Sequence, residues 1–163
     1  MIKVLELEID QKIPDFEIMN SNKKLITTKD DIIGKNTVIY FYPKDFTPGC
    51  TTEATEFTTN YDKFKNNDIQ IFGISKDDIK SHKKFSEKMK IPYELLSDVD
   101  KQVSKKFDVW GEKKFMGKKY EGILRTTFLI DKKGVVFKIF KNVKPKNHAN
   151  EVLNAFESIL KTK

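Results

Sequence analysis

Cysteine is almost absent from this 163-residue sequence, which contains only Cys50, and there are two histidines. A single cysteine excludes an intramolecular disulfide, so the fold does not depend on oxidation, which is typical of a reducing compartment such as the cytoplasm. One cysteine and two histidines without ligand spacing predict no metal site, and no motif requires another cofactor.

Long hydrophobic runs are also missing. No segment approaches the roughly 18 apolar residues that a transmembrane helix needs. The N-terminal segment MIKVLELEIDQK has a charged residue every two or three positions, unlike the apolar core of a signal peptide. We therefore expect a soluble, cytoplasmic protein that is not bound to membranes.

Arginine occurs once, at Arg125, among 31 basic residues. The net charge of +7 comes from lysines scattered among acidic residues, and the one lysine cluster, at positions 113, 114, 118 and 119, belongs to no nucleic-acid-binding motif. We expect this cluster to be a solvated face, with no nucleic-acid partner. The solitary guanidinium offers a planar fork of donors that lysine cannot supply.

The length and composition indicate one globular domain spanning residues 1–163. A hydrophobic content of 38% with 12% aromatic residues is sufficient for a buried core. Neither an internal repeat nor a linker divides the chain.

The single cysteine lies where a strand is predicted to meet a helix. Residues 38–42 are β-branched or aromatic, typical of a strand buried on both faces, and Pro43 ends this run. From Cys50 onward apolar residues recur at helical intervals, with Glu53 where acidic side chains suit a first turn. A helix start stabilises a thiolate, and Thr47 is placed to aim its hydroxyl at the sulfur.

Two segments resemble the signature motifs of the peroxiredoxins. YPKDFTPGCTTEA has the peroxiredoxin spacing of proline, threonine and peroxidatic cysteine in Pro43, Thr47 and Cys50, and it is closest to the Q-type, or bacterioferritin comigratory protein, branch. GILRTTFLID, which contains Arg125, resembles the arginine-bearing strand of that branch. The similarity runs from about residue 13 to the C-terminus, and it implies a thioredoxin-like α/β fold, with a mixed sheet flanked by helices, and thiol-dependent peroxidase activity.

In the chemistry that this resemblance implies, the Cys50 thiolate attacks the terminal oxygen of hydrogen peroxide or an organic hydroperoxide and becomes a sulfenic acid. We expect the Thr47 hydroxyl, the Cys50 N–H and Arg125 to donate hydrogen bonds to the moving charge. Pro43 should pack over the sulfur. By resemblance Glu53 orients Arg125, although an ordinary first-turn acid is an equally good interpretation.

Thr55 is where the sequence departs from much of the branch. Many Q-type members have a resolving cysteine five residues after the peroxidatic one, and that position here is Thr55. We therefore expect a one-cysteine cycle in which an external thiol, namely thioredoxin, glutaredoxin or glutathione, reduces the sulfenic acid. We expect a monomer or weak homodimer.

The rest of the chain predicts further elements in order. They are an N-terminal hairpin over 16–27, a helical turn at 28–32, a strand at 69–75 that forms a βαβ unit with 38–42, a helix over 76–89 ended by Pro92, a strand at 93–96, a helix over 99–107, a polar surface loop over 111–120, a hairpin over 125–141 and a C-terminal helix that His148 opens.

Two other functional classes remain open. A Cys-His hydrolase requires His82 or His148 against Cys50, but both histidines are better interpreted as packing or hydrogen-bonding residues. A redox-inactive thioredoxin-fold binding or chaperone module has no need of Thr47, Cys50 and Arg125 together. Phe46 and Trp110 are interpreted as core residues, with an active-site pocket wall as the alternative.

Overall fold

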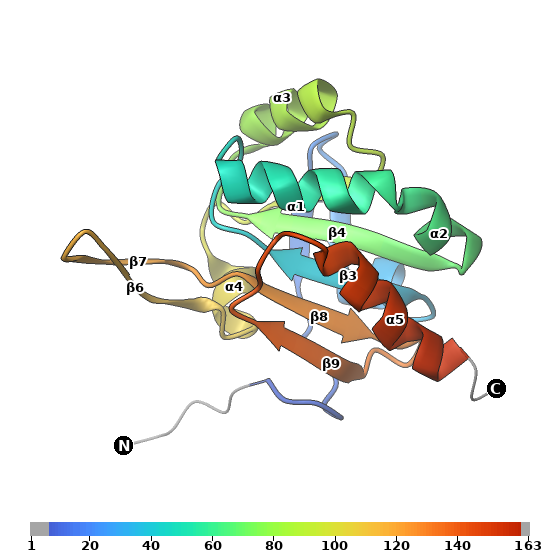
Figure 1. Cartoon of the computed structure of the whole chain (residues 1–163). Coiled ribbons are helices and arrows are strands. Elements are labelled where there is room, and N and C mark those ends of the chain that lie inside the picture. Colours follow the sequence, from blue (N-terminus) through green and yellow to red (C-terminus); the bar gives the residue numbers. More distant parts are fainter. Residues whose placement is uncertain (1–6, 161–163) are drawn as a thin grey trace, which may run out of the picture.

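The computed structural model describes residues 7–160 (Figure 1). Residues 1–6, half of the segment tested above for a signal peptide, lie outside this range. A seven-stranded sheet in the order β2-β1-β5-β4-β3-β8-β9 forms the centre. Its strands are β1 (Glu17–Asn20), β2 (Leu25–Thr27), β3 (Asn36–Phe41), β4 (Ile69–Ser75), β5 (Glu94–Ser97), β8 (Thr126–Ile130) and β9 (Val136–Lys141). Strands β3, β4 and β5 are parallel and the other neighbours antiparallel, which confirms the predicted mixed sheet with the N-terminal hairpin at its edge.

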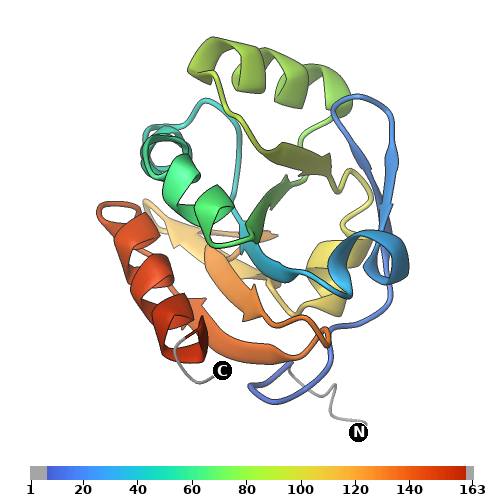
Figure 2. The same ribbon diagram turned by 90° about the vertical axis from the view of Figure 1, so that its right-hand side faces the viewer.

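Helices cover both faces of this sheet (Figure 2). One face packs against α1 (Pro48–Thr59), α2 (Tyr61–Asn66), α3 (Ile79–Met89) and α5 (His148–Leu160), and the other against the short helices η1 (Thr28–Ile32) and α4 (Gln102–Lys106). Within residues 7–160, no helix has both the length and the apolar character that crossing a bilayer requires.

Strand β3 is the centre of the sheet, and all six of its residues are buried. Val38 and Tyr40 contribute to the core beneath α1 and α5, whereas Ile39 and Phe41 contribute to the core on the opposite face. Side chains of a strand alternate between faces, so a central strand with helices on both sides is apolar throughout. The prediction of a doubly buried strand before Cys50 is confirmed.

The helix that carries Cys50 differs from the prediction at both ends. It begins at Pro48, two residues earlier than predicted, because the fixed φ of proline suits the first helical position. The apolar spacing predicts one helix that fades near residues 66–68, but the helix ends at Thr59, where Asn60 donates both its backbone N–H and its side-chain amide to the Glu56 carbonyl. The predicted single helix is therefore two helices, and Glu53, the sixth residue of α1, does not belong to its first turn.

The predicted surface loop over 111–120 is wrong. Strands β6 (Trp110–Phe115) and β7 (Lys118–Ile123) form a separate antiparallel hairpin, which projects from the body of the molecule (Figure 1). Its two-residue turn, Met116 and Gly117, has φ values of 51° and 81°, and positive φ at both positions is the requirement of a type I′ turn. Methionine is not a usual turn residue, so local sequence does not predict a hairpin here.

Two other boundaries differ from the prediction. Helix α3 begins at Ile79, three residues later than predicted, because the Asp78 side chain accepts the Ser81 N–H and caps the helix there. Its end at Met89 agrees with the prediction, although the left-handed Lys90, with φ 53°, ends it before Pro92 is reached. The helix predicted over 99–107 is shorter, because the Asp98 carboxylate accepts the backbone N–H groups of Val103 and Ser104 and so caps a helix that begins at Gln102.

The sheet brings the two motif segments together. Strands β3 and β8 are antiparallel, with Phe41 opposite Thr126. The chain leaves β3 after Phe41 toward Cys50, and it enters β8 directly after Arg125. Because the end of β3 and the start of β8 lie at the same edge, the cysteine loop and the arginine meet there.

Candidate active site

Cys50 is the third residue of α1 and is 1% exposed. The first backbone bond of the helix runs from the Thr51 N–H to the Thr47 carbonyl, so the Cys50 N–H precedes the helical ladder. The Cys50 Sγ accepts a hydrogen bond of 3.3 Å from Arg125 Nη2. A helix start and a guanidinium therefore both favour negative charge on this sulfur.

Arg125 is held between a carboxylate and the sulfur. Its Nη1 donates to Glu53 Oε1 at 2.7 Å, while Nη2 reaches Cys50, so one planar fork joins the two groups. The side chain of Glu53 is completely buried and that of Arg125 is 16% exposed. This geometry favours the orienting interpretation of Glu53 over that of a first-turn acid.

Burial and ion pairing oppose each other in this pair. Burial raises the pKa of Glu53, Arg125 lowers it, and the result is a pKa of about 7. Burial lowers the pKa of Arg125, but Glu53 and Cys50 outweigh burial and raise it. Within residues 7–160, Glu53 Oε2 is buried without a hydrogen-bond partner, which adds to the cost of its ionised form.

The raised pKa of Glu53 predicts a pH dependence of stability. Between about pH 4.5, its ordinary pKa, and about pH 7 the folded protein retains a proton that the unfolded chain releases. The stabilisation is therefore complete below that window and is lost as the pH rises through 7. Because glutamine does not ionise, Glu53→Gln should lose less stability than wild type between about pH 5 and about pH 8. Urea unfolding at both pH values measures this.

Glu112→Gln is the matched control, since Glu112 lies on the hairpin with its side chain 61% exposed. The free energy of unfolding of Glu112→Gln should change with pH as much as that of wild type. A wild-type slope in Glu53→Gln would show that the folded protein does not hold a proton on Glu53.

Gly49, which the sequence analysis did not single out, allows Arg125 to approach the helix. A Cβ at this position would lie 3.1 Å from Arg125 Nη2, the atom that donates to the sulfur, and 3.7 Å from Pro145 Cγ. That separation is tighter than most contacts of a real Cβ, so the guanidinium would have to shift. The glycine before the cysteine is therefore part of how the arginine is placed.

We expect Gly49→Ala to slow the reaction of Cys50 with peroxide by roughly tenfold without lowering stability. The shift moves a preorganised donor off its target, whereas alanine improves helix propensity by up to about 1 kcal/mol. Stopped-flow rate constants and urea unfolding measure the two effects. A wild-type rate constant in Gly49→Ala would mean that the 3.3 Å contact is not required.

Thr47 and Pro43 are less engaged with the sulfur than predicted. The Thr47 hydroxyl donates to the Lys44 carbonyl at 2.8 Å, so its proton does not point to Cys50, and the predicted donor geometry is wrong here. Its oxygen retains lone pairs that can accept a hydrogen bond. Pro43 is half-buried just after β3, and its packing over the sulfur stays a prediction.

A buried cluster anchors the loop before Cys50. Asp45 Oδ1 accepts from the Tyr42 hydroxyl at 2.6 Å, and Oδ2 accepts from the Ser81 hydroxyl at 2.8 Å and lies 2.7 Å from His82 Nδ1. Ser81 and His82 belong to α3, so this helix holds the loop against β3. Sequence reasoning did not find the cluster, because the residues lie 36 and 37 positions apart and meet only in the fold.

The same cluster contains the side chains of a metal site, but their oxygen atoms already accept hydrogen bonds. Asp45, Asp77 and His82 each place one possible ligand atom within 4.8 Å of the others. The Asp77 oxygen already accepts from the Ser75 hydroxyl at 2.6 Å and from the Asp45 N–H at 2.8 Å. Donors therefore satisfy these oxygens, and the cluster is a hydrogen-bond network.

Neither histidine touches the cysteine. His82 is bound to Asp45 and, through Nε2, to the Leu96 carbonyl at 2.9 Å. His148 lies against the Thr127 hydroxyl at 2.8 Å and Glu151 at 3.3 Å. Among the residues that the structure describes, Arg125 is the side chain that hydrogen-bonds to the sulfur, so the Cys-His hydrolase lacks its base.

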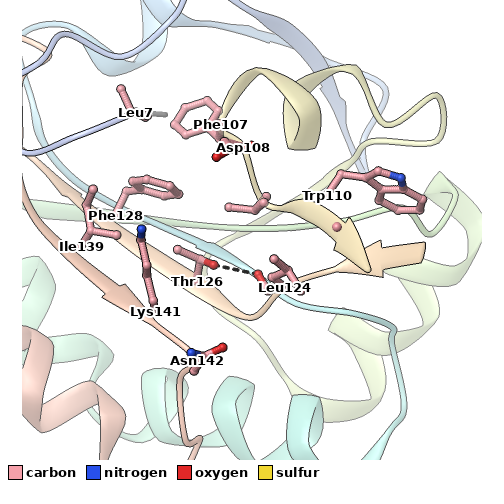
Figure 3. Close-up of a pocket in the computed structure, with 12 residues that line it drawn as sticks. Leu7, Phe107, Asp108, Trp110, Leu124, Thr126, Phe128, Ile139, Lys141 and Asn142 are labelled. Atoms are coloured by element: carbon pink, nitrogen blue, oxygen red, sulfur yellow. Dashed lines mark hydrogen bonds between the residues drawn. The ribbon is translucent and has the colours of Figure 1, made fainter. Parts of the chain in front are cut away.

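The prediction of a core residue is wrong for Phe46, whereas Trp110 is half-buried and packs against the edge of the core. Phe46 is 46% exposed, has a φ of 66°, and packs its ring edge-on to Phe85. Trp110 lines a cavity of about 320 Å³ together with Phe107 and Phe128 (Figure 3). That cavity lies on the face of the sheet opposite to Cys50, because its aromatic residues belong to the other core cluster.

Comparison with known proteins agrees with this geometry. The model of the AhpC/TSA family matches residues 9–139, which is most of the chain. The chain belongs to this family. Peroxiredoxin Bcp of Bacillus subtilis is 43% identical over 95% of the chain and 98% of its own length, and peroxiredoxin Bcp of Escherichia coli is 41% identical over 86% and 90%.

Solved structures give the same fold. The bacterioferritin comigratory protein of Xanthomonas campestris superimposes with a TM-score of 0.83 at 38% identity, covering 88% of this chain and 90% of its own. PrxQ of Xylella fastidiosa gives a TM-score of 0.90 at 33% identity, covering 96% and 99%. The predicted peroxiredoxin of the Bcp type, its thioredoxin-like fold and its thiol-dependent peroxidase activity are confirmed, so the chaperone alternative is set aside.

Proposed function

We propose that this peroxiredoxin reduces hydrogen peroxide and organic hydroperoxides by a one-cysteine cycle at Cys50. The observation that carries the proposal is the contact between Arg125 Nη2 and Cys50 Sγ at 3.3 Å, with Glu53 fixing the other arm of the guanidinium. The sulfur attacks the terminal oxygen, the O–O bond breaks, and the departing oxygen takes a proton to leave as water or an alcohol. The product on the protein is a sulfenic acid.

The site residues divide the work of this step. Arg125 and the Cys50 N–H stabilise charge first on the sulfur and then on the departing oxygen. Glu53 keeps the guanidinium in place. The Thr47 oxygen, whose own O–H donates to the Lys44 carbonyl, accepts a hydrogen bond from the peroxide O–H and orients the substrate. Pro43 shields the sulfur from water.

An external thiol completes the cycle, because Cys50 is the only cysteine in the sequence. The thiol sulfur attacks the sulfenic sulfur, the S–O bond breaks, and water leaves as a mixed disulfide forms. A second thiol releases Cys50 and leaves the reductant as a disulfide. Candidates are thioredoxin, glutaredoxin and glutathione, in the reducing cytoplasm. The chain acts as a single domain and as a monomer or weak homodimer, with no role for nucleic acid, membranes, metals or cofactors.

A non-reducing gel and the mass of peroxide-treated protein test the resolving step. With glutathione present we expect a mixed disulfide on Cys50 and no disulfide-linked dimer, because the sulfur is 1% exposed. A quantitative dimer band that reductant removes would show that a second subunit resolves the intermediate, and would contradict the external-thiol cycle.

Overoxidation should follow from the missing resolving thiol. Excess peroxide should convert wild-type Cys50 to sulfinic acid unless a thiol intercepts it. Thr55 is exposed on α1, about 140° around the helix and ~7.5 Å along it from Cys50. Thr55→Cys should therefore form a disulfide and suppress sulfinic acid only as the start of α1 unwinds.

The exposed Thr59, at the end of the same helix, supplies the control. Thr59→Cys lies ~13 Å along the helix from Cys50 and should give no protection. Equal sulfinic acid in the Thr55→Cys variant and in wild type, by mass spectrometry, would show that α1 does not unwind on the time scale of overoxidation.

A further inference from the structure

The projecting β6–β7 hairpin has two chemically different faces. Residues paired across the two strands point to the same face, and successive residues along a strand alternate between faces. The register of the hairpin therefore shows on which face each side chain lies. Glu112, Glu121, Lys114 and Lys119 lie on the face that Trp110 begins. The other face carries Lys113, Tyr120 and Lys118, with Gly111 and Gly122. Both acids of the hairpin are therefore on one face, and the other is cationic.

The acidic residues are engaged on their own face. Glu112 Oε1 lies 3.6 Å from Lys119 Nζ, and Glu121 Oε2 accepts from the Trp110 indole N–H at 3.2 Å. Two carboxylates there offset two lysines. On the opposite face the described side chains include no carboxylate, so the charges of Lys113 and Lys118 are not offset within the hairpin.

On the cationic face, Lys113 lies against the end of the strand that leads to Arg125. Lys113 is half-buried, whereas its neighbour Lys114 is exposed. Lys113 Nζ donates to the Ile123 carbonyl at 3.0 Å, two residues before Arg125. Its stem crosses Gly122, where a Cβ would lie 3.3 Å from Lys113 Cδ. The hairpin leaves the molecule on the side where α1 begins (Figure 1).

Electrostatics supports this placement. Burial lowers the pKa of Lys113, as does the positive charge of Arg125, while the negative charge of Cys50 opposes both. Lys113 is therefore close enough to the active site to interact with its two central charges. Lys118 lies two strand positions farther out, roughly 7 Å beyond Lys113.

Hydrogen peroxide has no part that extends to this face, but a reductant does. When a thiol joins Cys50 in a mixed disulfide, the rest of the thiol molecule remains outside the buried sulfur and beside the hairpin. We propose that the Lys113 and Lys118 face binds the carboxylates of a small anionic thiol of the glutathione class while it reduces the sulfenic acid. This inference rests on the one-cysteine cycle proposed above.

The test compares anionic and neutral thiols on pre-oxidised protein. Stopped-flow measurement gives the rate of sulfenic acid reduction by the anionic thiols glutathione and 2-mercaptoethanesulfonate, and by the uncharged thiols 2-mercaptoethanol and thioglycerol. At low ionic strength the double variant Lys113→Gln, Lys118→Gln should slow the anionic thiols by about three- to tenfold, as expected for the loss of one half-buried and one exposed charge, and the neutral ones by less than about twofold. Added salt should shrink the difference.

The opposite face provides the matched control. Lys114→Gln with Lys119→Gln removes the same charge from the same hairpin and should change neither class of thiol by more than about twofold. Lys118→Gln alone, at an exposed position, keeps the test decisive if the Lys113 substitution prevents folding. Equal slowing by both double variants, or equal slowing of neutral thiols, would overturn the proposal.

Two results distinguish a failure of thiol binding at the hairpin from a failure of the one-cysteine cycle. If wild type forms no sulfenic acid with hydrogen peroxide, the one-cysteine cycle itself fails. If sulfenic acid forms but the charge of the thiol has no effect on the rate, only the proposed binding of the thiol by the Lys113 and Lys118 face is wrong. Slowing confined to a carboxylate-bearing hydroperoxide would assign the face to the oxidant and contradict the reductant site.

Discussion

Cys50→Ser should reduce peroxide at less than a few per cent of the wild-type rate, because serine is not ionised at neutral pH and the chain has no second thiol. The fold should survive. Serine is close to cysteine in size, and its hydroxyl can accept from Arg125 Nη2 as the sulfur does. Peroxide consumption with a dithiol reductant measures the loss, and circular dichroism with urea unfolding checks the fold.

Turnover above about a few per cent in folded Cys50→Ser protein, with thiol supplied, would mean that another group attacks peroxide. The nucleophile assignment would then be wrong, whatever the family of the chain.

Arg125→Lys should cost on the order of ten- to a thousandfold in the peroxide step, as the loss of a transition-state donor does. The guanidinium donates to Glu53 Oε1 and to Cys50 Sγ from two separate nitrogens. An ammonium is a single point of charge, and it cannot keep both contacts in the same planar arrangement. Stopped-flow measurement of Cys50 oxidation isolates this step from reduction by thiol.

Arg125→Met separates geometry from charge. If the geometry of the guanidinium is what matters, the lysine and methionine variants should react with peroxide at similarly reduced rates. A lysine variant with a wild-type second-order rate constant would show that charge alone suffices, and that the solitary arginine is not required for its shape.

Much of the site can be predicted from the sequence because it depends on local patterns. The apolar run over 38–42, the proline after it and the helical spacing after Cys50 predicted the strand-to-helix junction. The solitary arginine indicated the second half of the site. The pairing of Phe41 with Thr126 then places these two segments at one edge, which the sequence suggested only by resemblance.

What the sequence did not predict depends on contacts between distant residues. Gly49 reads as a turn residue, and its use as space for Arg125 is visible only when both are in place. Asp45 and His82 form their buried pair across 37 residues. The β6–β7 hairpin turns at a methionine, so local turn chemistry gave no sign of it.

The intact mass of the protein after one equivalent of hydrogen peroxide tests most directly whether Cys50 takes an oxygen atom from peroxide. We predict a gain of one oxygen atom, mapped to the Cys50 peptide, absent from Cys50→Ser and removed by added thiol. An unchanged mass while peroxide is consumed, or an oxygen found only on methionine, would contradict the account.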